Sequence, residues 1–170
     1  MKTAKPVSRI RKAFSLIELV IVVVIIAIIG AIAIPKMSRG AAGAGDAALT
    51  QDLSVLRSAL DLYQTENGGS YPTTANVYNA LTQYNDGNNN LSAVKGGAFI
   101  YGPYLRSVPN VPVGAKKGQN GITDGSAFAA QGGTAGASTN AGWMYNASTG
   151  TITANTTTEA DASSKLYNLY

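Results

Sequence analysis

The chain has 170 residues, which leaves room for one modest domain and a membrane segment. Its formal charge of +4 comes from the N-terminal segment, because five of the 13 basic residues precede Phe14. The rest of the chain carries eight basic and nine acidic residues, so we predict no nucleic-acid partner for the chain that begins at Phe14. The chain lacks cysteine and histidine. This excludes a disulfide framework, removes the usual general base and the commonest transition-metal ligand, and predicts a protein that is not an enzyme.

An apolar run follows the basic leader directly. Sixteen consecutive apolar residues extend from Leu19 to Ile34, and the run has 21 residues when it is counted from Phe14. At about 1.5 Å per residue, the longer run forms about 31 Å of helix, close to the thickness of a hydrocarbon core. Its many β-branched residues would favour a strand in water, but a single strand in lipid leaves its backbone groups unpaired. The run therefore predicts a transmembrane helix.

The charges on either side predict the orientation of this helix. Basic residues before the run outnumber Lys36 and Arg39 after it, so the positive-inside rule keeps the N-terminus cytoplasmic and exports the rest. The alternative is an ordinary secretory signal, cut after the small-residue pattern Ala31 to Ala33. Its apolar core would then be unusually long, and the cost of Glu18 would have no explanation.

Glu18 is the one charged residue within the span. An ionisable side chain costs up to about 2.5 to 3.5 kcal/mol at the centre of a transmembrane helix, less near an end, and by default marks function. The segment KAFSLIEL, Lys12 to Leu19, resembles the class III signal of type IV pilins and type II secretion pseudopilins. The resemblance implies that a prepilin peptidase cuts between Ala13 and Phe14 and N-methylates the new Phe14 amine. It also implies a helix kink at Pro35, whereas Ala13 replaces the family's usual glycine.

The same resemblance implies a partner for Glu18. In the family, the glutamate of an incoming subunit meets the N-terminal amine of a neighbour and guides assembly in the membrane. Glu18 is therefore the expected filament-assembly residue, and the Phe14 amine its partner. A carboxylate and a cationic amine can pair in a low dielectric. A second option stays open, because Phe14 and Glu18 are four residues apart and can pair within one helix.

Residues 38–68 are predicted to contain a soft junction followed by an amphipathic helix. Four leucines and a tyrosine recur at helical spacing and form one stripe that faces a core: Leu49, Leu53, Leu56, Leu60 and Tyr63. Asn67 to Gly69 tolerate a left-handed backbone and end the helix, and Pro72 blocks its continuation. Three glycines between residues 40 and 45 each weaken the helix by about 1 kcal/mol. That junction is either a segment that stretches in a filament or a simple hinge.

The middle of the chain carries a further resemblance. Ser58 to Leu81, SALDLYQTENGGSYPTTANVYNAL, and Gly102 to Gly114, GPYLRSVPNVPVG, are similar to the major pseudopilin of type II secretion, although Val111 to Gly114 replace that family's Asp-Pro-Trp-Gly. The resemblance implies an α+β, pilin-like fold: a long N-terminal helix, membrane-spanning in its first half, packs on a small antiparallel β-sheet. The expected domains are a cleaved leader (1–13), a transmembrane and filament-core helix (14–37), the junction and amphipathic helix (38–68), and a globular β domain with loops (69–170).

The region after residue 114 is predicted coarsely. QGGTAGASTNAG is rich in small residues and is expected to be an exposed loop. Trp143 to Tyr145 and Thr151 to Ala154 are predicted strands of a hairpin, joined by a turn over Asn146 to Gly150. Trp143 is assigned to the core rather than to a ligand platform. The final KLYNLY is either a last strand or a tail.

Metal binding in this chain would have to use oxygen ligands, because cysteine and histidine are absent. The family resemblance implies a calcium site in the C-terminal loops, whereas the clusters Asn85 to Asn90 and Asn120 to Gly125 contain Asn-Gly and Asp-Gly patterns that are usually turns. No twelve-residue EF-hand loop is present. We predict no metal cofactor, with calcium as the alternative. The acids available for it are Asp86, Asp124, Glu159 and Asp161, of which Asp124 and Asp161 are the candidate calcium ligands.

Taken with the resemblance, these features predict a structural subunit of a type IV pilin-like filament, most closely a type II secretion pseudopilus. The expected partners are the prepilin peptidase, copies of the chain and other pilin-like subunits, and an inner-membrane assembly platform with its ATPase. The expected location is the bacterial inner membrane, crossed once, with a periplasmic globular domain and a filament that can reach the cell surface. The alternatives are a type IV pilus pilin for adhesion, motility or DNA uptake, and an anchored binding module that never polymerises.

Overall fold

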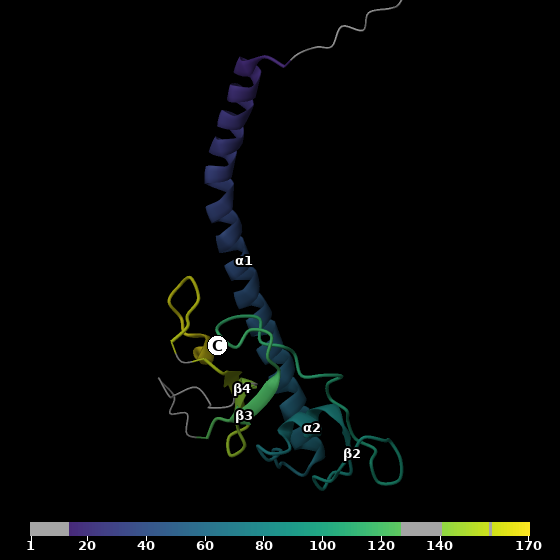
Figure 1. Cartoon of the computed structure of the whole chain (residues 1–170). Coiled ribbons are helices and arrows are strands. Elements are labelled where there is room, and N and C mark those ends of the chain that lie inside the picture. The colour runs from purple at the N-terminus through teal and green to yellow at the C-terminus, as the bar shows by residue number, and fades with distance from the viewer. Residues whose placement is uncertain (1–13, 127–140, 157) are drawn as a thin grey trace, which may run out of the picture. The chain divides into compact units, whose positions relative to one another are not determined.

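A computed structural model describes residues 14–126, 141–156 and 158–170. The chain divides into two compact units, residues 1–40 and residues 41–170. Helix α1, Leu16–Glu66, begins in the first unit and ends in the second (Figure 1). The remaining helices and strands all belong to the second unit, so the fold is α+β, as predicted.

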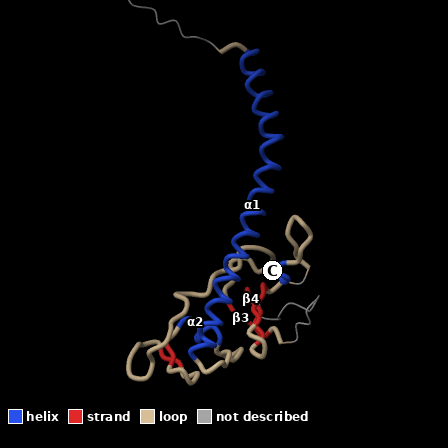
Figure 2. Tube along the Cα trace, turned by 180° about the vertical axis from the view of Figure 1, so that it is seen from behind, coloured by secondary structure: helices blue, strands red, loops and turns tan. Residues whose placement is uncertain are grey.

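The predicted stripe of α1 lies in the core of the C-terminal unit. Its four leucines and its tyrosine are all at most 1% exposed. The leucines share one buried cluster with Trp143, Tyr145 and Ile152 from the sheet. Figure 2 shows strands β3 and β4 beside this part of α1. The helical spacing therefore identified the face of α1 that packs on the sheet.

Helix α1 ends where the sequence predicted, at residues with a left-handed backbone. The helix ends at Glu66, and Gly68 and Gly69 follow with positive φ angles of 63° and 84°. The amide of Gly69 donates to the carbonyl of Gln64 at 2.8 Å, which is the 6→1 bond of a Schellman cap. A side chain at either glycine would strain this left-handed backbone.

Three small elements follow that the sequence did not predict. Helix α2, Val77–Thr82, buries Val77, Ala80 and Leu81. Strands β1, Tyr84–Asn85, and β2, Leu91–Ser92, pair antiparallel around the Asn85 to Asn90 cluster. Asp86 to Asn90 of that cluster form the connection between the two strands, as expected of a turn, whereas Asn85 is the last residue of β1.

The main sheet has three strands in the order β3, β4, β5: Gly121–Asp124, Ala141–Asn146 and Thr151–Ala154. β4 and β5 pair antiparallel and form the predicted hairpin. β3 pairs parallel with β4, so this sheet is mixed and not wholly antiparallel as expected. The prediction of a turn over Asn120 to Gly125 is accordingly wrong for β3. Its backbone gains partners on β4, and such distant pairing overrides local turn preference.

Two predictions for the C-terminal region have different outcomes. Trp143 is fully buried, and its indole nitrogen donates to the carbonyl of Pro109 at 2.8 Å, so its assignment to the core is confirmed. The final KLYNLY is neither a strand nor a tail, because Tyr167–Leu169 form a short 3₁₀ helix, η1, whose Tyr167 packs into the core. Most of the predicted QGGTAGASTNAG loop lies outside the described residues.

Candidate functional site

The apolar half of α1 has no protein core of its own within the described part of the N-terminal unit. The large apolar side chains from Phe14 to Ile32 are between 46% and 80% exposed. The 18-residue stretch Leu16–Ala33 has a mean hydropathy of 3.2, and none of it is buried. The helix is therefore long and apolar enough to cross a membrane, a property that it shares with secretory signals near an N-terminus.

Glu18 has a hydrogen-bond partner within its own helix. Its Oε2 accepts a hydrogen bond from the main-chain amide of Ser15 at 2.9 Å. In return, the Ser15 hydroxyl accepts a bond from the amide of Ile17 at 3.4 Å, and the Ser15 carbonyl accepts the first helical bond from Leu19 at 3.2 Å. Ser15 is therefore the N-cap of α1 and Glu18 its third helical residue. The pair forms a variant of the capping box, in which the serine hydroxyl accepts from the second helical amide, that of Ile17, and not from the third.

The hydrogen bond to Ser15 gives Glu18 a structural role at the start of α1. The first N–H groups of a helix have no intrahelical partner, and an unpaired N–H in a low dielectric costs far more than in water. Glu18 satisfies one of them and places its negative charge at the positive end of the helix dipole. An ionised carboxylate offers about four acceptor positions, so a cation can bind Glu18 while the bond to Ser15 remains.

The remaining predicted site residues are placed as follows. Ala13 lies outside the described residues, and Phe14 is the first described residue, 77% exposed. Pro35 falls within α1, whose helical assignment continues through it, and the kink stays a prediction. Ser15 was missed as a functional residue. The signal was available, because Ser-x-x-Glu directly before an apolar run is the pattern of a capping box.

The two candidate calcium ligands each accept hydrogen bonds from groups close to them in the sequence. The Asp124 carboxylate accepts bonds from the Ser126 amide at 2.8 Å and the Ser126 hydroxyl at 3.0 Å, which together hold the pKa of Asp124 below its usual value. The Tyr170 hydroxyl donates to Asp161, as do two main-chain amides, and these bonds lower the pKa of Asp161. No cluster of three acidic side chains that could share a metal ion occurs among the described residues. The absence of a metal cofactor, with calcium as the alternative, remains a prediction.

The N-terminal segment matches a known protein family model. Residues 8–34 match the prokaryotic N-terminal methylation motif. The match spans the Ala13–Phe14 junction, the capping box and the apolar helix up to Ile34, so the resemblance of this segment to the class III signal of type IV pilin-like proteins is confirmed. No curated protein and no solved structure matches the chain significantly.

Proposed function

We propose that the chain is a prepilin-like structural subunit of a type IV pilin-like filament, with a type II secretion pseudopilus as the favoured assembly. One observation carries the proposal: from Leu16 onward, the methylation motif of residues 8–34 coincides with helix α1, whose large apolar side chains are exposed there on every side. A helix of this kind needs an apolar environment around its whole circumference. Lipid supplies that environment before assembly, and a bundle of identical helices supplies it afterwards.

The proposed cycle follows from these two environments. The prepilin peptidase cuts before Phe14 on the cytoplasmic side, and the subunit waits in the inner membrane with residues 41–170 in the periplasm. An assembly platform and its ATPase then transfer it into a helical filament of the chain and other pilin-like subunits. A filament requires one heterologous contact that repeats without closing. Glu18 of an incoming subunit and the Phe14 amine of its neighbour provide a charge pair that fixes the register of that contact.

Two features favour the secretion pseudopilus over a type IV pilus. The segment Ser58 to Leu81 resembles the major pseudopilin, and the absence of cysteine argues against the disulfide-closed C-terminal region common in type IVa pilins. Genes beside the one for this chain provide a direct test. A secretion ATPase, a platform protein and an outer-membrane secretin are expected there, whereas retraction and adhesion genes would favour the pilus.

Mass analysis of the N-terminal peptide tests the processing step. The chain purified from membranes should begin at Phe14 and carry one added methyl group, and in cells without prepilin peptidase it should stay full length in the inner membrane. A product that begins at Ile34 would show ordinary signal-peptidase cleavage and would end the filament proposal. A membrane-anchored chain that is correctly processed but never sediments as a filament would favour the non-polymerising binding module.

A further inference from the structure

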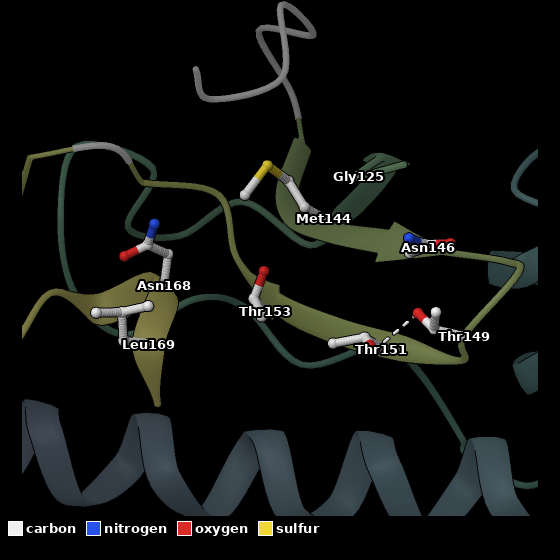
Figure 3. A pocket seen from close by; sticks show the side chains of 8 residues that line it. All are labelled: Gly125, Met144, Asn146, Thr149, Thr151, Thr153, Asn168 and Leu169. Carbon is white, nitrogen blue, oxygen red and sulfur yellow. Dashed lines mark hydrogen bonds between the residues drawn. The ribbon is translucent and has the colours of Figure 1, made fainter. Parts of the chain in front are cut away.

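A cavity of about 340 Å³ opens beside the three-stranded sheet in the C-terminal unit. Ile152 and Ala154 of β5 face the core, so the alternating residues Thr151 and Thr153 point to the opposite face of the sheet. Figure 3 shows the cavity on that face, with the helix α1 on the other side of β5. The cavity is thus separate from the surface of the sheet that packs on α1.

The walls of this cavity carry neutral hydrogen-bonding groups. Thr149, Thr151 and Thr153 contribute hydroxyls, and Asn146 and Asn168 contribute amides. The hydroxyls of Thr149 and Thr151 bond each other at 2.9 Å. Among the described residues, none that lines the cavity is ionisable. An ionised ligand would therefore lose its hydration without gaining a counter-charge, which is strongly unfavourable.

Asn168 is the residue in this wall that most needs a partner. It is 3% exposed, and neither the oxygen nor the nitrogen of its amide has a hydrogen-bond partner among the described residues. A buried polar group without a partner is costly, because it has given up its hydrogen bonds to water without replacing them. Figure 3 shows the side chains of Asn168, Thr153 and Met144 around one open space. A ligand that enters this space would satisfy the amide once the Asn168 side chain turns toward it, because each amide atom now has less than 1 Å² of accessible surface.

We propose that this cavity binds one neutral sugar unit. A sugar hydroxyl both donates and accepts hydrogen bonds, and so matches threonine hydroxyls and asparagine amides. Met144 and the 42% exposed Leu169 supply apolar contacts for the C–H groups of the sugar ring. The volume lies at the small end of the range for ligand pockets, about 300 to 1,000 Å³, which suits a single ring better than a long chain.

Nuclear magnetic resonance on the full-length chain tests the proposal. The chain is placed in zwitterionic micelles without sugar headgroups, and N-acetylglucosamine is titrated as the probe. We expect saturable shifts at the main-chain amides of Gly125 and Thr153 and at the side-chain amide of Asn168, with a Kd of about 1 mM. Glucuronate, which carries a charge, should bind at least tenfold more weakly because no cation lines the cavity.

Two substitutions locate the binding. Thr153→Val removes a hydroxyl at constant shape, Asn168→Leu removes the unpaired amide, and each should weaken binding about three- to tenfold. Thr65→Val, which removes a hydroxyl on α1 that bonds only within its helix, should leave binding unchanged. Asn168→Leu should keep or raise the thermal unfolding midpoint, since it breaks no hydrogen bond seen among the described residues.

Three results would overturn the proposal. The first is the absence of saturable shifts up to about 10 mM sugar. The second is equal affinity for glucuronate, which would contradict a neutral site. The third is unchanged affinity in both Thr153→Val and Asn168→Leu, which would place any binding elsewhere on the chain. If Asn168→Leu fails to fold, then Thr153→Val alone decides.

Discussion

Substitutions at Glu18 separate two tasks of one carboxylate. The carboxylate caps the start of α1 through its bond to the Ser15 amide, and its charge is proposed to pair with a Phe14 amine of another subunit. Glu18→Ala removes both the acceptor and the charge. Glu18→Gln keeps a carbonyl oxygen that can accept the Ser15 bond but removes the charge. The two variants should therefore agree in assembly and differ at the helix start.

The size of the effect of Glu18→Ala follows from the loss of the hydrogen bond between Glu18 and the Ser15 amide. Loss of one such hydrogen bond costs about 1 kcal/mol, which corresponds to about a fivefold increase in opening at the Ser15 amide. Insertion should not suffer, because removal of an acid lowers the cost of placing the helix in lipid, by up to about 3 kcal/mol at the centre and less near an end. Both variants should thus reach normal levels in the membrane and be cleaved before Phe14.

Amide hydrogen exchange on the full-length chain in micelles measures the cap. The Ser15 amide should exchange about fivefold faster in Glu18→Ala and at nearly the wild-type rate in Glu18→Gln. Ser15→Ala is the matched control: it keeps the Ser15 main-chain N–H that bonds Glu18 but removes the hydroxyl that accepts from Ile17, so the Ile17 amide should show the larger increase in exchange. The yield of sheared filaments, relative to membrane-held subunit, measures assembly and should fall in both Glu18 variants.

Two outcomes would refute this reasoning. Equally fast exchange of the Ser15 amide in Glu18→Ala and Glu18→Gln would show that the hydrogen bond does not hold the helix start. Normal filament yield from Glu18→Gln would show that the charge is dispensable, and the pair between subunits would have to be abandoned.

Three further predictions concern the C-terminal unit. Gly150→Ala should destabilise the C-terminal unit by at least about 2 kcal/mol, because Gly150 has a φ of +70° and a Cβ there would lie 2.2 Å from the Tyr71 ring. Urea unfolding followed by tryptophan fluorescence measures this, and a neutral effect would contradict the turn geometry. Trp143→Phe should lower the free energy of unfolding by about 2 kcal/mol, because it leaves a cavity and an unpaired Pro109 carbonyl. Unfolding followed by far-ultraviolet circular dichroism measures this, and a loss below about 0.5 kcal/mol would place Trp143 outside the core. The pKa of Asp161 is lowered chiefly by the Tyr170 hydroxyl, so the contribution of Asp161 to stability is present above about pH 4 and is lost as the pH falls through the folded pKa. Tyr170→Phe should therefore make the free energy of unfolding less sensitive to acid, and an unchanged pH profile of stability would argue against the bond.

Local patterns predicted the elements whose causes are local. The spacing of Leu49 to Tyr63 gave the buried face of α1, because helical side chains three and four apart share one face. The hairpin of β4 and β5 followed from short runs of strand-forming residues on both sides of a turn that ends in Gly150, whose φ of +70° is a left-handed conformation that glycine adopts without strain. Helix α2 has only six residues, too few for a periodic signal to stand out from its surroundings.

Long-range contacts could not be predicted from the same patterns. The parallel pairing of β3 with β4 depends on residues far apart in the chain, and the Asn-Gly and Asp-Gly pairs around β3 indicate turns when they are read alone. Gly45 illustrates the same limit. It was interpreted as a helix-weakening residue of the junction, but a Cβ there would lie 2.8 Å from Val113. Its small size therefore also permits close packing, which only the fold reveals.

The capping box also explains how one helix end can suit two environments. Before cleavage, five basic residues precede Phe14 and favour the cytoplasmic surface, where charge is well solvated. Cleavage before Phe14 would remove all five and leave one new amine beside one carboxylate, so the helix end would become neutral overall. Ser15 would remain in the processed chain, so the cap would survive cleavage and the first turn would stay formed. A capped, neutral helix end can enter a dry bundle at much lower cost than one that carries unpaired charge. Processing would thus prepare the same helix for the filament without any change in its fold.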